Sequence, residues 1–127
     1  MPDLSSERPA GGRRIDAEVT REIVRIHAHY YGRGPTKAKT YVNDEVILCV
    51  LGEIFTPSEE MLIEAGRFLE VRTNRMAFQD TVEPIMREAI ERISARGVRA
   101  LLSQISPEGL STEVFILDRA ELAAASA

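Results

Sequence analysis

The stretch Val46-Ile47-Leu48-Cys49-Val50-Leu51 decides the fold, because it places six apolar residues in a row. A short apolar run of this kind is typical of a β-strand, and apolar side chains on both of its faces predict that both faces are covered. The Asn43-Asp44 pair just before it marks a turn or a bulge. We therefore expect other elements to pack on both sides of this strand.

An amphipathic helix is expected before the strand. Its apolar residues recur at spacings of three and four, which places them on one side of a helix. They are Ile15, Val19, Ile23, Ile26 and Tyr30. Gly32 can adopt positive φ and ends the helix, and Pro35 prevents its continuation.

A second helical region follows the strand. In Thr56-Pro57-Ser58-Glu59, Thr56 can cap the helix, Pro57 suits its first position and Glu59 completes a capping box. The helical pattern continues through residue 80, with Gly66 as a weak point. Because proline lacks an amide donor, we expect a break or kink at Thr81–Pro84, and then a final helix that Gly97 closes.

Two more strands are expected at Val98–Ile105 and Thr112–Leu117, with a link short enough for an antiparallel hairpin. The sequence therefore predicts an α+β fold: a three-stranded, mainly antiparallel sheet packed with three to four helices, in the order helix, strand, helices, strand, strand. Three helices leave part of such a sheet uncovered, and a homodimer is the simplest way to bury the remaining apolar face.

The domain organisation is simple. Residues 1–14 combine prolines, glycines and charges with little apolar content, which predicts a disordered N-terminal arm. Residues 15–118 are predicted to form a single α+β domain, and residues 119–127 an Ala-rich C-terminal tail.

Composition excludes several function classes. A net charge of −4 argues against a nucleic-acid-binding protein, which usually has a basic excess. Cys49 is the single cysteine, which suits a reducing compartment such as the cytoplasm. No apolar run approaches the roughly 18 residues of a membrane span. We therefore expect no direct membrane insertion, and contact with a membrane only through an embedded partner.

The most unusual segment is residues 32–41, which we call the basic segment. No Asp or Glu occurs from Ile23 through Asn43, although the chain is acidic. Extended backbone would project Lys37, Lys39 and Tyr41 to the same side. The candidate ligand- or partner-binding residues are Arg33, Gly34, Thr36, Lys37, Lys39 and Tyr41. Helix termination and ordinary solvation explain the same residues, so both interpretations stay open.

The other candidate residues form no catalytic or metal-binding set. His27 and His29 are spaced i, i+2, so they diverge on a helix and do not form a metal pair. Cys49 lies among aliphatic residues, where a thiol is usually inert packing. Ser103 and Gln104 interrupt an apolar strand and mark either a pocket lining or the exposed end of the strand. No catalytic residue, metal or cofactor is predicted.

The residues also resemble a known family. The stretch Tyr30–Tyr41 is similar to the signature of small bacterial MpsC-like proteins of the YbcI type. Four weaker matches follow, and with the first they span about residues 15–118. They are Leu62-x-x-Ala65-Gly66-Arg67, Arg75-x-x-Phe78, Leu102-Ser103-Gln104-Ile105-Ser106-Pro107 and Glu113-Val114-Phe115. The family is named for a sodium-translocating, membrane-potential-generating system whose membrane components are linked to inorganic-carbon uptake. The resemblance implies an accessory cytoplasmic protein and supplies no catalytic residues.

Three functional hypotheses follow. The first is a non-enzymatic accessory or regulatory protein, dimeric, that docks to a partner through the basic segment and the first helix. The second is a sensor that holds a small anion or a nucleotide phosphate with Arg33, Thr36, Lys37 and Lys39. The third, an enzyme with a pocket near Tyr41 and Gln104, is the weakest, because no nucleophile is paired with a base.

Overall fold

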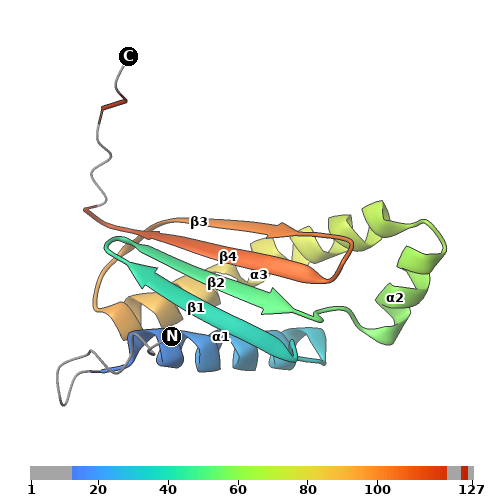
Figure 1. The fold of residues 1–127 in the computed structure, drawn as a ribbon, viewed down its shortest axis with the longest axis horizontal. Helices are drawn as coiled ribbons and strands as arrows, with labels where there is room; N and C mark the ends of the chain where they lie inside the picture. Colours follow the sequence, from blue (N-terminus) through green and yellow to red (C-terminus); the bar gives the residue numbers. More distant parts are fainter. Residues whose placement is uncertain (1–12, 120–123, 126–127) are drawn as a thin grey trace, which may run out of the picture.

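The computed structural model describes residues 13–119 and 124–125. Within them the chain forms α1 (Ile15–Tyr31), β1 (Lys37–Asn43), β2 (Val46–Gly52), α2 (Pro57–Glu64), α3 (Phe68–Ser94), β3 (Val98–Ile105) and β4 (Leu110–Leu117), shown in Figure 1. All seven elements fall within the range predicted for the domain. The predicted arm and tail lie almost wholly outside the described residues.

One antiparallel sheet contains all four strands, in the order β1-β2-β4-β3. The α+β class is confirmed, but the prediction of three strands is wrong. The additional strand is β1, which lies in the basic segment and pairs with β2 through a turn at Asp44, whose φ is +51°. As an edge strand, β1 carries polar residues on its exposed side, so its sequence lacks the apolar run that marks β2.

The helices divide at Gly66, not at Pro84. Gly66 has a φ of +80°, and the amides of Gly66 and Arg67 bond the carbonyls of Ile63 and Leu62, both at 2.9 Å. This pair of bonds is a Schellman motif, which closes α2. The break expected at Thr81–Pro84 does not occur, and the predicted final helix is part of α3, which runs continuously through Pro84.

Packing explains why α3 tolerates a proline. Val82, Met86 and Ile90 are buried on both sides of Pro84 along the chain, whereas Pro84 itself is exposed. Burial of this continuous apolar side outweighs the loss of one backbone hydrogen bond.

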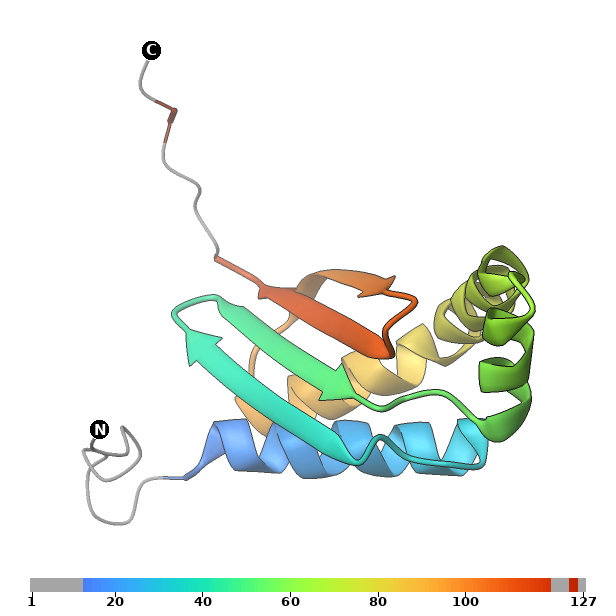
Figure 2. The same ribbon diagram turned by 45° about the vertical axis from the view of Figure 1, so that its right-hand side comes forward.

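Both long helices cover the same face of the sheet. In Figures 1 and 2, α1 and α3 lie on one side, and α2 lies beyond one end of the strands. The strands place Ile47, Leu51 and Phe115 against these helices with at most a trace of exposed surface. No helix of the described residues lies on the other side of the sheet, which we call the open face. The expectation that other elements cover β2 on both sides is therefore met on one face only.

The turn at Gly66 yields a stability prediction. Replacing Gly66 by Ala should lower the free energy of unfolding by about 1 kcal/mol, because an L-residue at positive φ is strained. Space is not the cause, since no atom lies within 4 Å of an added Cβ. Gly66→Asn should lose less, because asparagine tolerates this conformation better. Urea unfolding of the three proteins measures the difference; equal losses for Ala and Asn would contradict the strain argument.

Candidate functional site

A polar row crosses the helix-covered face of the sheet. Thr40 of β1, Cys49 of β2, Glu113 of β4 and Ser103 of β3 are direct neighbours in the strand register. Glu113 has no exposed surface, and Thr40 is 5% exposed. Since buried polar groups need partners, this row marks the most specialised part of the core.

One oxygen of Glu113 is fully bonded. Its Oε2 accepts a hydrogen bond from Gln79 Nε2 of α3 at 2.6 Å and a short one from the Ser103 hydroxyl. Gln79 Nε2 also donates to Ser103 Oγ at 2.8 Å. Two strands and one helix are therefore linked through a single carboxylate oxygen.

The other oxygen of Glu113 faces a histidine. Glu113 Oε1 has no hydrogen-bond partner, and His27 Nε2 lies 3.6 Å from it. His27 Nδ1 is 2.9 Å from the carbonyl oxygen of Ile23, which can only accept, so Nδ1 carries a hydrogen. Nε2 and Oε1 are then both acceptors, and they attract each other only when a proton lies on one of them.

A second polar centre lies beside this pair. Arg75 of α3 is 5% exposed and donates two hydrogen bonds to Glu59 of α2, at 2.6 and 2.7 Å. It also donates to the carbonyl of Ile54 at 2.8 Å, and its guanidinium lies 4.2 Å from the ring centre of Tyr31. Tyr31 in turn stacks on His27 with the ring centres 5.3 Å apart.

Glu59 has two roles at once. It accepts from the backbone amide of Thr56 at 2.9 Å and so completes the predicted capping box of α2, while it also binds Arg75. Burial raises the pKa of this carboxyl, but the hydrogen bonds from Arg75 and Thr56 outweigh burial and hold the pKa below its ordinary value. Burial likewise raises the pKa of Tyr31, to about 12.

Cys49 lies in the polar row but is not activated. Its side chain is fully buried, and burial raises its pKa to about 11 despite a hydrogen bond with Thr40. The thiol is therefore protonated at neutral pH and is a poor nucleophile.

The candidate residues of the basic segment do not converge on a single binding site. Arg33 donates a short hydrogen bond to the carbonyl of Phe55, and Thr36 donates one to Glu53. The hydrogen bond from Thr36, together with the charges of Lys37 and Arg33, lowers the pKa of Glu53. Arg33 and Lys37 therefore share a neighbouring carboxylate, which weakens their positive potential.

The remaining candidates of the segment have distinct positions. Lys39 and Tyr41 project from β1 onto the open face, with Lys39 Nζ 5.4 Å from the Tyr41 ring centre. Gly34 lies against α1, where an added Cβ would come within 3.2 Å of Ala28 Cβ. Gly34 therefore allows close packing of the segment against α1. The cations that face outward are Lys37 and Lys39 of β1.

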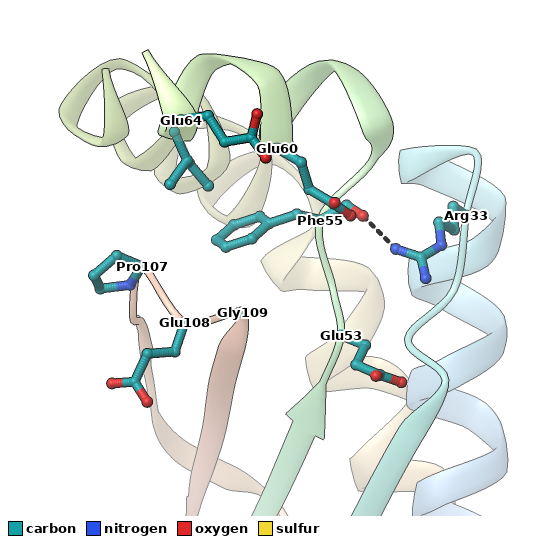
Figure 3. A pocket seen from close by; sticks show the side chains of 9 residues that line it. Arg33, Glu53, Phe55, Glu60, Glu64, Pro107, Glu108 and Gly109 are labelled. Carbon is teal, nitrogen blue, oxygen red and sulfur yellow. Dashed lines mark hydrogen bonds between the residues drawn. The ribbon is translucent and has the colours of Figure 1, made fainter. Parts of the chain in front are cut away.

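Figure 3 shows the pocket into which Arg33 projects. Its volume is about 410 Å³, and most of its charged lining is acidic. The carboxylates are those of Glu53, Glu60, Glu64 and Glu108. They repel an anion more than one guanidinium attracts it. This arrangement favours the partner-docking interpretation of the basic segment over the anion-sensor interpretation.

The other candidate residues form two pairs, His27 with His29 and Ser103 with Gln104, and the members of each pair lie in different surroundings. His27 points into the core, whereas His29 is exposed and packs edge-on to Tyr30. Ser103 belongs to the buried cluster, while Gln104 is exposed and accepts from Arg72 at 3.4 Å. Both residues line a cavity of about 360 Å³, so the pocket-lining alternative holds for both, whereas the exposed strand end holds for Gln104 alone.

The residues at the centre of the polar cluster were not predicted from the sequence as site residues. They are Glu113, Gln79, Arg75 and Glu59 in its partner-binding role. One signal was available: in a hairpin linked by residues 106–109, Ser103 is opposite Glu113, so two polar residues meet inside two apolar strands. The distant partners His27 and Gln79 had no such signal.

The fold and the site define a class: a small α+β protein with a four-stranded antiparallel sheet, helices on one face and an enclosed polar cluster. The profile of the family described as "Na⁺-translocating membrane potential-generating system (MpsC)" matches residues 12–119. The chain belongs to the MpsC family, which confirms the resemblance of its motifs. No curated protein and no solved structure matches the chain. In the part of the chain that the structure describes, no helix is long and apolar enough to cross a membrane.

The geometry of Glu113 predicts opposite results for two substitutions. Glu113→Gln should change the free energy of unfolding by less than about 1 kcal/mol, because its amide can donate to His27 Nε2 while its oxygen still accepts from Gln79 and Ser103. Glu113→Ala should cost about 2–4 kcal/mol, because it leaves a cavity and unpaired buried donors. Urea unfolding checks both. A large loss for Gln would show that the negative charge itself is required.

The Glu59–Arg75 pair predicts a pH dependence. The folded state holds the pKa of Glu59 below its ordinary value of 4.5, so the pair stabilises the protein above that pH, and the stabilisation disappears as pH falls through the lower folded value. Between pH 7 and pH 3, wild type should therefore lose more stability than Glu59→Gln. Thermal unfolding across this range tests the prediction, and parallel curves would contradict it.

Proposed function

We propose that the chain is a non-enzymatic accessory or regulatory component of a membrane-potential-generating system, and that it acts through protein–protein contact. Membership of the MpsC family supports the link to such a system. The observation that carries the binding role is the open face. Its apolar centre is bordered by Lys37 and Lys39, the only two lysines in the chain.

The state of the buried groups supports a role without catalysis. A reacting group must be open to its substrate, but Glu113 has no exposed surface and His27 is 3% exposed. The cavity beside His27 and Gln79 measures about 10 Å³, which is room for one water molecule. Cys49 is held as a thiol. These groups hold the fold together and leave binding to the surface.

The same proposal places the chain in the cytoplasm, next to a membrane-embedded partner protein. A free, buried cysteine suits a reducing compartment. Lys37 and Lys39 on the open face provide positive charge for an acidic protein surface, while the apolar centre provides contact area.

The cellular experiment removes the chain and measures the membrane potential with a cationic dye. We expect cells without it to lose part of the Na⁺-dependent potential, and the wild-type chain to restore that part. A potential that is unchanged in sodium-containing and sodium-free media would contradict the proposed system.

Co-sedimentation separates a protein partner from lipid. The chain should sediment with native membrane vesicles and not with protein-free anionic lipid vesicles. Lys37→Glu combined with Lys39→Glu should reduce the bound fraction several-fold. The matched control is Arg21→Glu combined with Arg25→Glu, which reverses two exposed charges on α1. Equal losses for the two pairs would assign the effect to net charge and remove the open face from the proposal.

A further inference from the structure

The open face is mostly apolar, and its residues align in rows across the four strands. The central row consists of Tyr41, Leu48, Val114 and Leu102, of which Tyr41 is 51% and Leu102 is 59% exposed. One adjacent row consists of Asn43, Val46, Ile116 and Ala100. The other consists of Lys39, Val50, Thr112 and Gln104. None of the residues in these rows is acidic.

The two edges of this face differ in charge. The β1 edge carries Lys37 and Lys39. At the β3 edge, a cavity of about 360 Å³ is lined by open-face residues of β3 and β4 together with Asp80 and Glu83 of α3. Glu83 is partly neutralised by Arg87 at 2.6 Å, and Asp80 is exposed. Arg72 of α3 also reaches this edge, where it donates to Gln104 at 3.4 Å. The face therefore has a positive edge, an apolar centre and an edge of mixed charge.

We infer that the occupant of the open face is a second copy of this chain, related by a two-fold axis parallel to the strands. Such an axis lays β1 of one copy over β3 of the other. Lys39 and Gln104 belong to the same row, so Lys39 then lies over Gln104 of the partner copy and beside the cavity that contains Asp80 and Glu83. Each positive edge meets the edge that carries Asp80 and Glu83, twice per dimer.

The other simple arrangement is electrostatically worse. A two-fold axis across the strands would place β1 over β1, and the lysines of both copies would lie along the same edge. A dimer with the axis along the strands is therefore favoured, with its sheets packed in the aligned manner of a β-sandwich.

The size of the face agrees with a dimer interface. Four strands about 4.8 Å apart and about seven residues long cover roughly 400 Å² of flat area. Exposed side chains add to that area, so two copies bury on the order of 1,000 Å², near the lower bound for a specific interface. A patch of this size is also close to the largest that monomers usually expose.

This inference rests on the proposed binding role of the open face and names its occupant. The second copy and the membrane-embedded partner then bind the same face, so the dimer must dissociate before the partner is bound. The inference also assigns Leu102 and Tyr41 to a buried centre, and Lys37, Lys39, Asp80 and Glu83 to a charged rim.

Sedimentation velocity over a concentration series tests the inference. Wild type should sediment at twice the 14.1 kDa chain mass at micromolar concentration. Leu102→Glu should raise the dissociation constant at least about fiftyfold, because it buries a charge in each half of the interface. Leu69→Glu is the matched control, since Leu69 is 69% exposed on α3 and away from the open face, and it should leave the constant unchanged. Circular dichroism and thermal unfolding confirm that each variant is folded.

A charge exchange tests the orientation of the two copies. Lys39→Glu should weaken the dimer about tenfold at low salt, and adding Asp80→Lys to the same chain should restore it to within about threefold. In wild type, acetylation should modify Lys37 and Lys39 several-fold more slowly as the concentration rises through the dissociation constant. Because the chain has no other lysine, this measurement needs no variant.

Several results would overturn the inference: a monomeric wild type at tens of micromolar, a dimer that Leu69→Glu disrupts as strongly as Leu102→Glu, or a charge exchange that weakens the dimer further. A monomeric chain that still needs Lys37 and Lys39 to sediment with native membranes would remove the second copy and leave the proposed function intact. If the chain is a dimer but cells without it keep their full Na⁺-dependent potential, the proposed function fails and the inference of a dimer stands.

Discussion

A carboxylate enclosed at the centre of the sheet constrains the rest of the structure. Removing Glu113 from water costs several kcal/mol unless its oxygens are paired. Gln79 of α3 and Ser103 of β3 both donate to Oε2, and His27 of α1 faces Oε1 at 3.6 Å. A one-residue slip of β3 would move Ser103 to the open face and remove one of the two donors to Glu113 Oε2. The buried charge therefore specifies both the strand register and the rotation of the two long helices.

The buried ion pair of Glu59 and Arg75 extends this order to the end of the sheet. Glu59 caps α2 and binds Arg75, and Ile63 packs against the core, so these two residues hold the short helix α2, none of whose residues is fully buried. Together the two centres make the covered face polar at its middle. The open face is apolar at the same level, where Leu48 and Val114 are neighbours. A sheet that is polar where it is enclosed and apolar where it is accessible is suited to contact with another protein.

Much of the fold could be predicted, because α1, β2, β3 and β4 bury apolar side chains in the periods their elements require. β1 could not, since an edge strand with Lys37 and Lys39 on one side has the composition of a loop. The break expected at Pro84 does not occur, because packing along α3 outweighs the low helix propensity of proline. The polar cluster could not be predicted from the sequence for a different reason. His27, Gln79 and Glu113 are far apart in the sequence, and no spacing pattern connects them. The basic segment was found, but only the structure separates Arg33, in an acidic pocket, from Lys39 on the open face.

The edges of the sheet favour the proposed closed dimer over an open chain of copies. Lysines on an edge strand prevent it from pairing with another strand, and β1 carries both lysines of the chain. The opposite edge, β3, has an irregular register between Val98 and Ala100, which disturbs the regular row of amides that pairing needs. Edge-to-edge pairing could add further copies without limit. When two open faces are in contact, each covers the other, so no further copy can be added through them. The lysines that block the first mode project onto the open face, where the second mode supplies them with carboxylates.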